Sequence, residues 1–178
     1  MKVAGERLTA ATFEELAMPL FDQLYNFAHW LAQDRTEAED LVQETYVKAL
    51  KGFSSFQAGT NFRAWMYRIL RNTFLTSRTG LKATATVELD SDDSPELSAG
   101  PETPETILID NSQHQLLQSA IESLPVRFRE ILLLCEVEEM SYQEIAETLS
   151  IPMGTVMSRL SRARKALRES LQQQLVKA

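Results

Sequence analysis

An acidic segment between residues 83 and 106 divides the chain and limits what it can fold into. The segment reads ATATVELDSDDSPELSAGPETPET, and residues 83–115 carry eight carboxylates and no Lys or Arg. A stretch rich in Ser, Thr, Pro and Asp and poor in large apolar side chains is typical of a flexible linker. We therefore expect an N-terminal domain over residues 1–82, a linker over 83–104 and a C-terminal domain over 105–178.

Composition indicates an ordinary globular protein. The 178 residues are 44% hydrophobic and 24% charged, values common in globular domains. No apolar run approaches the ~18 residues that a membrane span needs, and the N-terminus lacks the apolar core of a signal peptide. We expect a cytoplasmic protein without membrane insertion. Cys135 is the only cysteine, and its apolar surroundings, EILLLCEV, favour a buried structural thiol over a redox role.

The sequence offers no candidate metal or catalytic centre. The two histidines, His29 and His114, do not stand at ligand spacing from Cys135 or from a carboxylate cluster. A phosphate-binding Gly-rich loop, a G-x-S-x-G motif and an H-E-x-x-H motif are all missing. We therefore expect no metal, no cofactor and no enzymatic activity, although missing motifs do not by themselves exclude an enzyme.

Helical patterns cover most of the remaining sequence, and strand patterns are almost absent. Three segments have the form of capping boxes, in which a side chain at the helix start and a Glu three residues later satisfy each other's backbone amides: TFEE at 12–15, TEAE at 36–39 and SYQE at 141–144. The sequence predicts an all-α fold of two small helical domains. The expected helices lie near residues 13–33, 37–51, 61–79, 105–123, 126–138, 142–149 and 155–172.

Positive charge gathers in two blocks, although the formal net charge is -7. Residues 61–82 and residues 153–168 each hold five basic and no acidic side chains. The second block follows a capped helix at 142–149 and a turn with Pro152 and Gly154, which is the order of a DNA-binding helix-turn-helix. The alternative is a solvated basic face on a terminal helix.

A helical wheel separates two faces of the second block. Val156, Leu160, Ala163 and Leu167 share the face that we expect to pack inward. Ser158, Ser161, Arg162 and Lys165 fall on the opposite face, and Arg159 and Arg168 fall on its flanks. Guanidinium groups and small hydroxyl side chains on one exposed face suit contact with base edges and phosphates.

The first block places Trp65, Arg68 and Asn72 on one flank of a helix, at spacings of three and four residues. A ring that stacks on a base, a cation for a phosphate and an amide for a base edge together suit single-stranded nucleic acid. The alternative is core packing for Trp65 and a surface or capping role for Asn72, and this stretch alone leaves both open. The inward stripe of the same helix is expected to hold Phe62, Met66, Ile69, Leu70 and Thr73.

Taken together, three motifs resemble bacterial RNA polymerase sigma factors of the extracytoplasmic-function (ECF) group. They are EAEDLVQETYVKAL at 37–50, FRAWMYRILRNTF at 62–74 and the stretch from LPVRF to KALR at 124–168. The resemblance implies a factor that binds core RNA polymerase, directs it to promoters, helps melt DNA at the minus-ten element and initiates transcription. It also implies a stress response, control by an anti-sigma factor and action through binding rather than catalysis.

The resemblance also implies roles for individual residues. The surface for the clamp helices of the largest polymerase subunit would consist of Asp40, Leu41, Val42, Gln43 and Glu44. The surface for minus-ten DNA would consist of Arg63, Trp65, Arg68, Arg71 and Asn72. In that surface Asn72 stands at the position that contacts a flipped base, and the loop SFQAGTNF at 55–62 helps to hold the base. The surface for minus-thirty-five DNA would consist of Thr155, Ser158, Arg159, Ser161, Arg162 and Lys165.

Two further expectations follow from the resemblance, and the chain departs from the family pattern at two positions. The helices over 116–138 would meet the flap of the second-largest polymerase subunit, and the acidic linker would thread the channel where RNA runs. Thr76 stands where the family often has a second Asn, and Met157 stands where some members have Arg.

Two other classes of protein share part of these features. A helix-turn-helix regulator that works without polymerase explains the C-terminal motif but leaves the flank with Trp65 and the DLVQET motif at 40–45 unexplained. An interaction protein, such as an anti-sigma factor or an adaptor, would have helical bundles without DNA contact.

Overall fold

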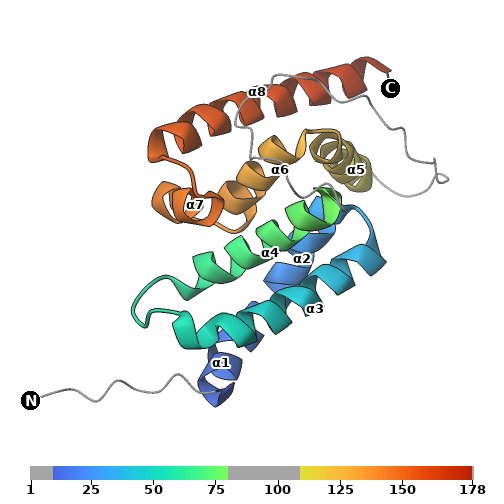
Figure 1. Cartoon of the computed structure of the whole chain (residues 1–178). Helices are drawn as coiled ribbons and strands as arrows, with labels where there is room; N and C mark the ends of the chain where they lie inside the picture. Colours follow the sequence, from blue (N-terminus) through green and yellow to red (C-terminus); the bar gives the residue numbers. More distant parts are fainter. Residues whose placement is uncertain (1–9, 80–108, 178) are drawn as a thin grey trace, which may run out of the picture. The chain divides into compact units, whose positions relative to one another are not determined.

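A computed structural model of the chain describes residues 10–79 and 109–177, with side chains from residues 12 and 112 onward in these ranges. Every regular element in these residues is helical, and none is a strand, which confirms the all-α expectation (Figure 1). The predicted linker at 83–104 lies outside the described residues. By its contacts the chain forms two compact units. Of the described residues, the first unit contains 10–79 and 140–151, and the second contains 109–139 and 152–177.

The first unit begins with three short helices where the sequence predicts one. They are α1 (Ala10–Ala17), the 3-10 helix η1 (Met18–Leu20) and α2 (Phe21–Ala32). The break falls at Pro19, which has no backbone N–H to continue an α-helical ladder. Thr12 lies inside α1, so the expected capping box at residues 12–15 is wrong.

Helix α3 (Arg35–Gly52) starts with a cap that differs from the expected one. Asp34 has extended backbone angles, and its Oδ1 accepts a hydrogen bond from the Glu37 N–H at 2.8 Å. Asp34 thus takes the capping role predicted for Thr36, which lies inside the helix. The change follows from Gln33, whose left-handed backbone (φ 57°) ends α2 and leaves Asp34 as the last residue before the new helix.

The core of the first unit lies where α2, α3 and α4 (Phe62–Thr79) pack against one another (Figure 1). A short 3-10 helix, η2 (Phe53–Ser55), leads from α3 into the loop before α4. Three of the five residues in the predicted inward stripe of α4 are buried, namely Met66, Leu70 and Thr73. The largest buried side chains of these helices are Leu24, Phe27, Leu31, Met66, Tyr67, Leu70 and Phe74. Each such side chain contributes about 1.5–3 kcal/mol through burial.

Helix α7 (Tyr142–Leu149) packs on α4 in the same unit. Its predicted capping box is confirmed. Ser141 Oγ accepts from the Glu144 N–H at 3.2 Å, and Glu144 Oε2 accepts from the Ser141 N–H at 2.8 Å. The helix ends at Ser150, which adopts a left-handed backbone with φ 55°.

The second unit consists of α5 (Ile109–Glu122), α6 (Val126–Leu132), the π-helical segment η4 (Leu133–Val137) and α8 (Met153–Lys177). Helices α5 and α6 both pack on α8. Of the four predicted inward residues, Val156, Leu160 and Ala163 are buried, and Leu167 is only partly buried. Helix α8 runs farther in both directions than the predicted 155–172. Within the predicted part of α8, Ser170 Oγ lies 2.8 Å from the Oγ of Ser123, which directly follows α5, and this hydrogen bond ties α8 to the end of α5.

Within the described residues, the helices are too short or too polar to cross a membrane.

Candidate nucleic-acid interface

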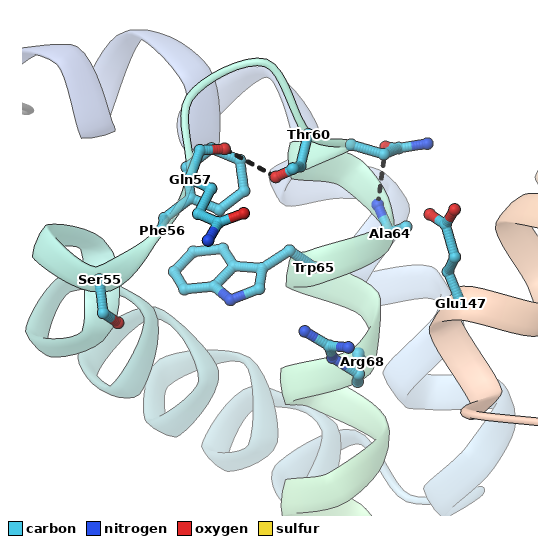
Figure 2. A pocket seen from close by; sticks show the side chains of 9 residues that line it. Ser55, Phe56, Gln57, Thr60, Ala64, Trp65, Arg68 and Glu147 are labelled. Carbon is cyan, nitrogen blue, oxygen red and sulfur yellow. Dashed lines mark hydrogen bonds between the residues drawn. The ribbon is translucent and has the colours of Figure 1, made fainter.

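Trp65 forms one wall of a surface pocket on α4. The indole ring rests on two phenyl rings, with its centroid 5.0 Å from that of Phe56 and 5.6 Å from that of Phe62. Arg68, one turn along the helix, lies beside it and is exposed (Figure 2). The sequence left open whether Trp65 serves the core or a binding surface. In the structure the ring packs on the aromatic cluster and also lines the pocket.

The loop before α4 supplies the opposite wall. The pocket has a volume of about 360 Å³ and is lined by Ser55, Phe56, Gln57, Thr60, Asn61, Ala64, Trp65, Arg68 and Glu147. The loop is held by its own hydrogen bonds, since Thr60 Oγ1 donates to the Gln57 carbonyl at 2.7 Å and Ser55 Oγ to the Gly52 carbonyl at 2.7 Å. Gly59 adopts φ 90°, a conformation that side chains other than glycine rarely take. The predicted loop and the predicted aromatic residue are thus brought together.

Asn61 connects this loop to α4 and to α7. Its Oδ1 accepts from the Ala64 N–H at 3.0 Å and so caps the start of α4, and its Nδ2 donates to Glu144 Oε1 at 2.7 Å. The pKa of Glu144 is lowered, chiefly by the hydrogen bond from the Ser141 backbone, with smaller contributions from Asn61, from the Ser141 side chain and from the charge of Arg63. Sequence reasoning missed Asn61 as a cap, although an Asn directly before an apolar helical pattern is the signal for one.

The other residues predicted for minus-ten DNA lie outside the pocket lining. The Arg63 guanidinium lies over the Tyr67 ring, 5.8 Å from its centroid. Asn72 is exposed one turn beyond Arg68, and Arg71 is partly exposed. The structure therefore groups Trp65 and Arg68 with the loop, and it leaves Arg63, Arg71 and Asn72 as neighbours along the same helix.

A second basic surface lies on α8. The predicted outward residues Ser158, Ser161, Arg162 and Lys165 are all exposed, and Thr155 is partly exposed. Lys165 Nζ lies 3.9 Å from Glu169 Oε1, an exposed pair that contributes little to stability. Among the described residues, Arg162 takes part in no ion pair. This face can offer hydroxyl, guanidinium and ammonium groups to a DNA groove.

Two arginines of α8 instead point toward neighbouring carboxylates of the second unit. Arg159 Nη1 lies 4.0 Å from Oε1 of Glu130 on α6, and the two side chains are only 15% and 1% exposed. Arg164 binds Oε1 of Glu136 through Nη2 at 2.7 Å and through Nε at 3.1 Å. The basic residues of this helix thus differ in role, which the sequence alone did not separate.

Cys135 lies beside the second of these pairs. The thiol is partly exposed rather than buried, and Arg164 Nη2 donates to its Sγ at 3.8 Å. Desolvation raises the pKa of the thiol, and the charge of Glu136 adds to the rise, while Arg164 opposes it. The thiol form is therefore favoured at neutral pH.

The residues predicted to dock on polymerase divide between the surface and the core of α3. Asp40, Gln43 and Glu44 are exposed, and Glu44 Oε1 lies 2.8 Å from Lys48 Nζ. Leu41 and Val42 are 3% and 1% exposed, so their side chains pack in the core and are not available to a partner. Among the described residues, no three His, Cys, Asp or Glu side chains lie together in a way that could hold a metal ion.

Comparison with known proteins assigns the two regions that carry these surfaces to one protein family. Residues 16–84 match the family model of sigma-70 region 2, and residues 114–167 match that of sigma-70 region 4. The chain is 35% identical to the ECF RNA polymerase sigma factor SigE of Mycolicibacterium smegmatis over 94% of its own length, and it spans 64% of the length of that relative. It is 31% identical to the ECF sigma factor SigW of Bacillus subtilis, with 84% of this chain and 83% of the relative covered.

A solved structure agrees with these matches. The sigma factor RpoE of Bartonella quintana, crystallised with the anti-sigma factor NepR, is 30% identical, with a TM-score of 0.65 over 90% of this chain and 96% of that one. The helical units and the two matched regions define a protein of the sigma-70 type. Within that class, the chain belongs to the ECF RNA polymerase sigma factors.

Proposed function

We propose that this protein binds core RNA polymerase in the cytoplasm and directs it to promoters by contacting two DNA elements, without catalysing a reaction itself. The observation that carries the proposal is the position of the two basic surfaces. One lies on α4 inside the region 2 match, and the other lies on α8 inside the region 4 match. Each surface has at least one exposed arginine, Arg68 on α4 and Arg162 on α8.

The surface on α4 suits melted minus-ten DNA. A base flipped out of the duplex needs a pocket with an aromatic wall and polar groups for its edge. Trp65 provides the wall, and Gln57, Thr60 and Asn61 provide polar groups around the same pocket. Arg68 also lines the pocket and is exposed, so its charge can meet a phosphate, and Arg71 and Asn72 extend the surface along the helix. The volume of about 360 Å³ falls in the range of pockets that hold small molecules, about 300–1,000 Å³.

The surface on α8 suits double-stranded minus-thirty-five DNA. Ser158, Ser161, Arg162 and Lys165 share the face turned away from the core, so that they can enter the major groove together. Thr155 lies in the first turn of α8. In helix-turn-helix motifs the N-terminal residues of the recognition helix contact the base edges.

The polymerase contact is assigned to the exposed side of α3. Asp40, Gln43 and Glu44 can meet the clamp helices of the largest subunit, while Leu41 and Val42 support this helix from within. The helices over 116–138 are assigned to the flap of the second-largest subunit. A net charge of -7 weakens DNA binding by the free protein, because phosphate contacts dominate nonspecific affinity. Polymerase then supplies selective binding by holding both DNA-binding surfaces at once.

An anti-sigma factor is the expected regulator. The Bartonella quintana relative was crystallised with one, and an anti-sigma factor that covers the α3 or α4 surface would block polymerase or DNA. Release of such a factor under stress would switch transcription on.

Run-off transcription tests the function directly. The purified protein is added to bacterial core polymerase, and transcripts are sequenced from a library of random promoters. We expect starts that depend on the protein and share two sequence elements. Arg68→Ala should weaken selection at the minus-ten element, and Arg162→Ala at the minus-thirty-five element. Arg35→Ala, an exposed arginine outside both surfaces, is the matched control. Binding to DNA without any binding to polymerase would favour an independent helix-turn-helix regulator.

A further inference from the structure

The arginine side chains of α8 fall into two groups around the helix axis. Its buried face is centred on Val156, Leu160 and Ala163. At 100° per residue, Arg159 and Arg164 lie about 70° to either side of the centre of that face, whereas Arg162 lies about 130° from it. The first two arginines therefore border the packed face, and each one meets a glutamate of the segment that α8 packs on.

The pair at Arg159 differs from the pair at Arg164 in its burial. Glu130 is 1% exposed, and Arg159 Nη1 stands 4.0 Å from its Oε1 with only 15% of the Arg159 side chain exposed. The Arg164–Glu136 pair is shorter, at 2.7 Å, but its side chains are 45% and 56% exposed. Water screens the second pair, so it contributes little. The Arg159–Glu130 pair is largely shielded from water. Removal of a paired cation from a buried carboxylate strongly destabilises the folded protein.

Glu130 also lies next to a second charged residue of α6, Arg129, which is 6% exposed. The Arg129 Nη2 donates to the Leu124 carbonyl at 3.0 Å and so holds the turn between α5 and α6. Arg159 is the cation that α8 itself brings to Glu130. The pair therefore joins α6 to the helix that carries the exposed basic face.

We propose that Arg159 is a positioning residue. It pairs with the buried Glu130, fixes the rotation of α8 about its axis, and so presents Ser158, Arg162 and Lys165 to DNA without contacting DNA itself. This inference rests on the proposed function of the α8 surface, and it departs from the role that resemblance implies for Arg159. A swing of the guanidinium to a phosphate would leave the Glu130 carboxylate buried without this partner, and that cost opposes it.

Replacement of both charged residues tests whether Arg159 positions α8 or contacts DNA itself. The double variant Arg159→Met with Glu130→Leu removes the pair and keeps apolar volume, a change that buried ion pairs often tolerate. We expect the holoenzyme with this variant to bind a promoter with a minus-thirty-five element within about threefold of the wild-type affinity. The slope of log affinity against log salt should stay unchanged. Arg159→Ala alone should weaken binding by more than about tenfold, because it leaves Glu130 buried without this cation.

The matched control is Arg162→Ala, one turn along the same helix. Loss of a phosphate contact lowers the salt slope by about one, and we expect this change for Arg162→Ala alone. The proposal would be overturned by a folded double variant whose affinity for the promoter falls and whose salt slope decreases by about one. If Arg162→Ala changes neither affinity nor slope, the proposed DNA-binding function of α8 fails instead.

A measurement on the wild-type protein covers the case in which the double variant does not fold. The holoenzyme is treated with phenylglyoxal, which modifies accessible arginines, with and without promoter DNA, and modified peptides are counted by mass spectrometry. We expect Arg159 to react slowly in both samples, and Arg162 to react quickly until DNA protects it. An Arg159 that reacts quickly in the free holoenzyme and becomes protected by DNA would show direct contact and would overturn the proposal.

Discussion

The indole ring of Trp65 lies against the phenyl ring of Phe56, with ring centroids 5.0 Å apart and planes inclined by 46°. Phe56 comes from the loop before α4 and is 9% exposed, so the loop and the helix share one aromatic cluster. The contact orients the indole and leaves part of it open to the pocket. Any base that stacks on Trp65 therefore meets a ring whose position is already fixed, which lowers the entropy cost of binding.

Replacement of Trp65 tests this arrangement. Trp65→Ala should reduce melting of minus-ten DNA by the holoenzyme, because stacking on an aromatic side chain contributes about 1–3 kcal/mol per base. Trp65→Phe, which keeps a ring, should retain most of the activity. Permanganate reactivity of unpaired thymines measures the melting. Equal melting by the alanine variant would mean that Trp65 serves the aromatic cluster alone.

The exposed side of α3 should bind polymerase without contributing much to stability. Simultaneous replacement of Asp40, Gln43 and Glu44 by Ala should weaken binding to core polymerase at least ~10-fold while the unfolding free energy changes by less than about 1 kcal/mol, since exposed ion pairs contribute little. Leu41→Ala should destabilise the protein by about 2–5 kcal/mol, because it leaves a cavity in the core. Pull-down titration and urea unfolding measure the two effects. Normal polymerase binding by the triple variant would remove this face from the proposed interface.

The cap of α3 can be tested by comparing two neighbouring residues. Asp34→Ala should lower the unfolding free energy by about 1 kcal/mol, because the Glu37 N–H loses its 2.8 Å acceptor. Thr36→Ala is the control and should change it by less than about 0.5 kcal/mol, as expected for an exposed residue inside the helix. Urea unfolding measures both variants. A larger loss of unfolding free energy in Thr36→Ala than in Asp34→Ala would support the capping box expected at residues 36–39.

The lowered pKa of Glu144 predicts a contribution to stability that acid removes. The folded state favours the carboxylate, so the contribution is complete above the ordinary pKa of 4.5 and is lost as the pH falls through the lower pKa of the folded state. Glu144→Gln should therefore reduce the drop in thermal midpoint between pH 6 and pH 3. Glu147→Gln on the same helix is the control and should change that drop less. An unchanged acid sensitivity in Glu144→Gln would contradict the prediction.

The surroundings of Cys135 predict opposite effects of two neighbouring charges. Arg164 lowers the pKa of the thiol and Glu136 raises it, so Arg164→Ala should slow alkylation by iodoacetamide at pH 8, and Glu136→Gln should accelerate it. Alkylation depends on the thiolate fraction, and the rate measured from pH 7 to pH 10 gives the pKa directly. Arg164→Lys keeps the positive charge and should stay close to the wild-type rate. Two variants with the same pKa as the wild type would show that neither charge acts on the thiol.

The features that sequence alone determined are those with local causes. The capping box of Ser141 and Glu144, the helical class and the inward face of α8 at Val156, Leu160 and Ala163 each depend on residues within a few positions of one another. The capping box forms whenever its segment is helical, and the spacing of the apolar residues fixes which side of α8 they share, so the pattern and the structure agree.

The tertiary structure decided the rest, because the deciding partner lies far away in the sequence. The burial of Leu41 and Val42 depends on α2 and α4, which no pattern within DLVQET reveals. The pocket at Trp65 depends on Phe56 and on the loop hydrogen bonds that hold it. Arg159 and Arg162 look alike in sequence, but a buried glutamate 29 positions before Arg159 faces only one of them. Burial and charge pairing are properties of the packed chain, so only its packing could distinguish the arginine that faces a buried glutamate from the one that is exposed.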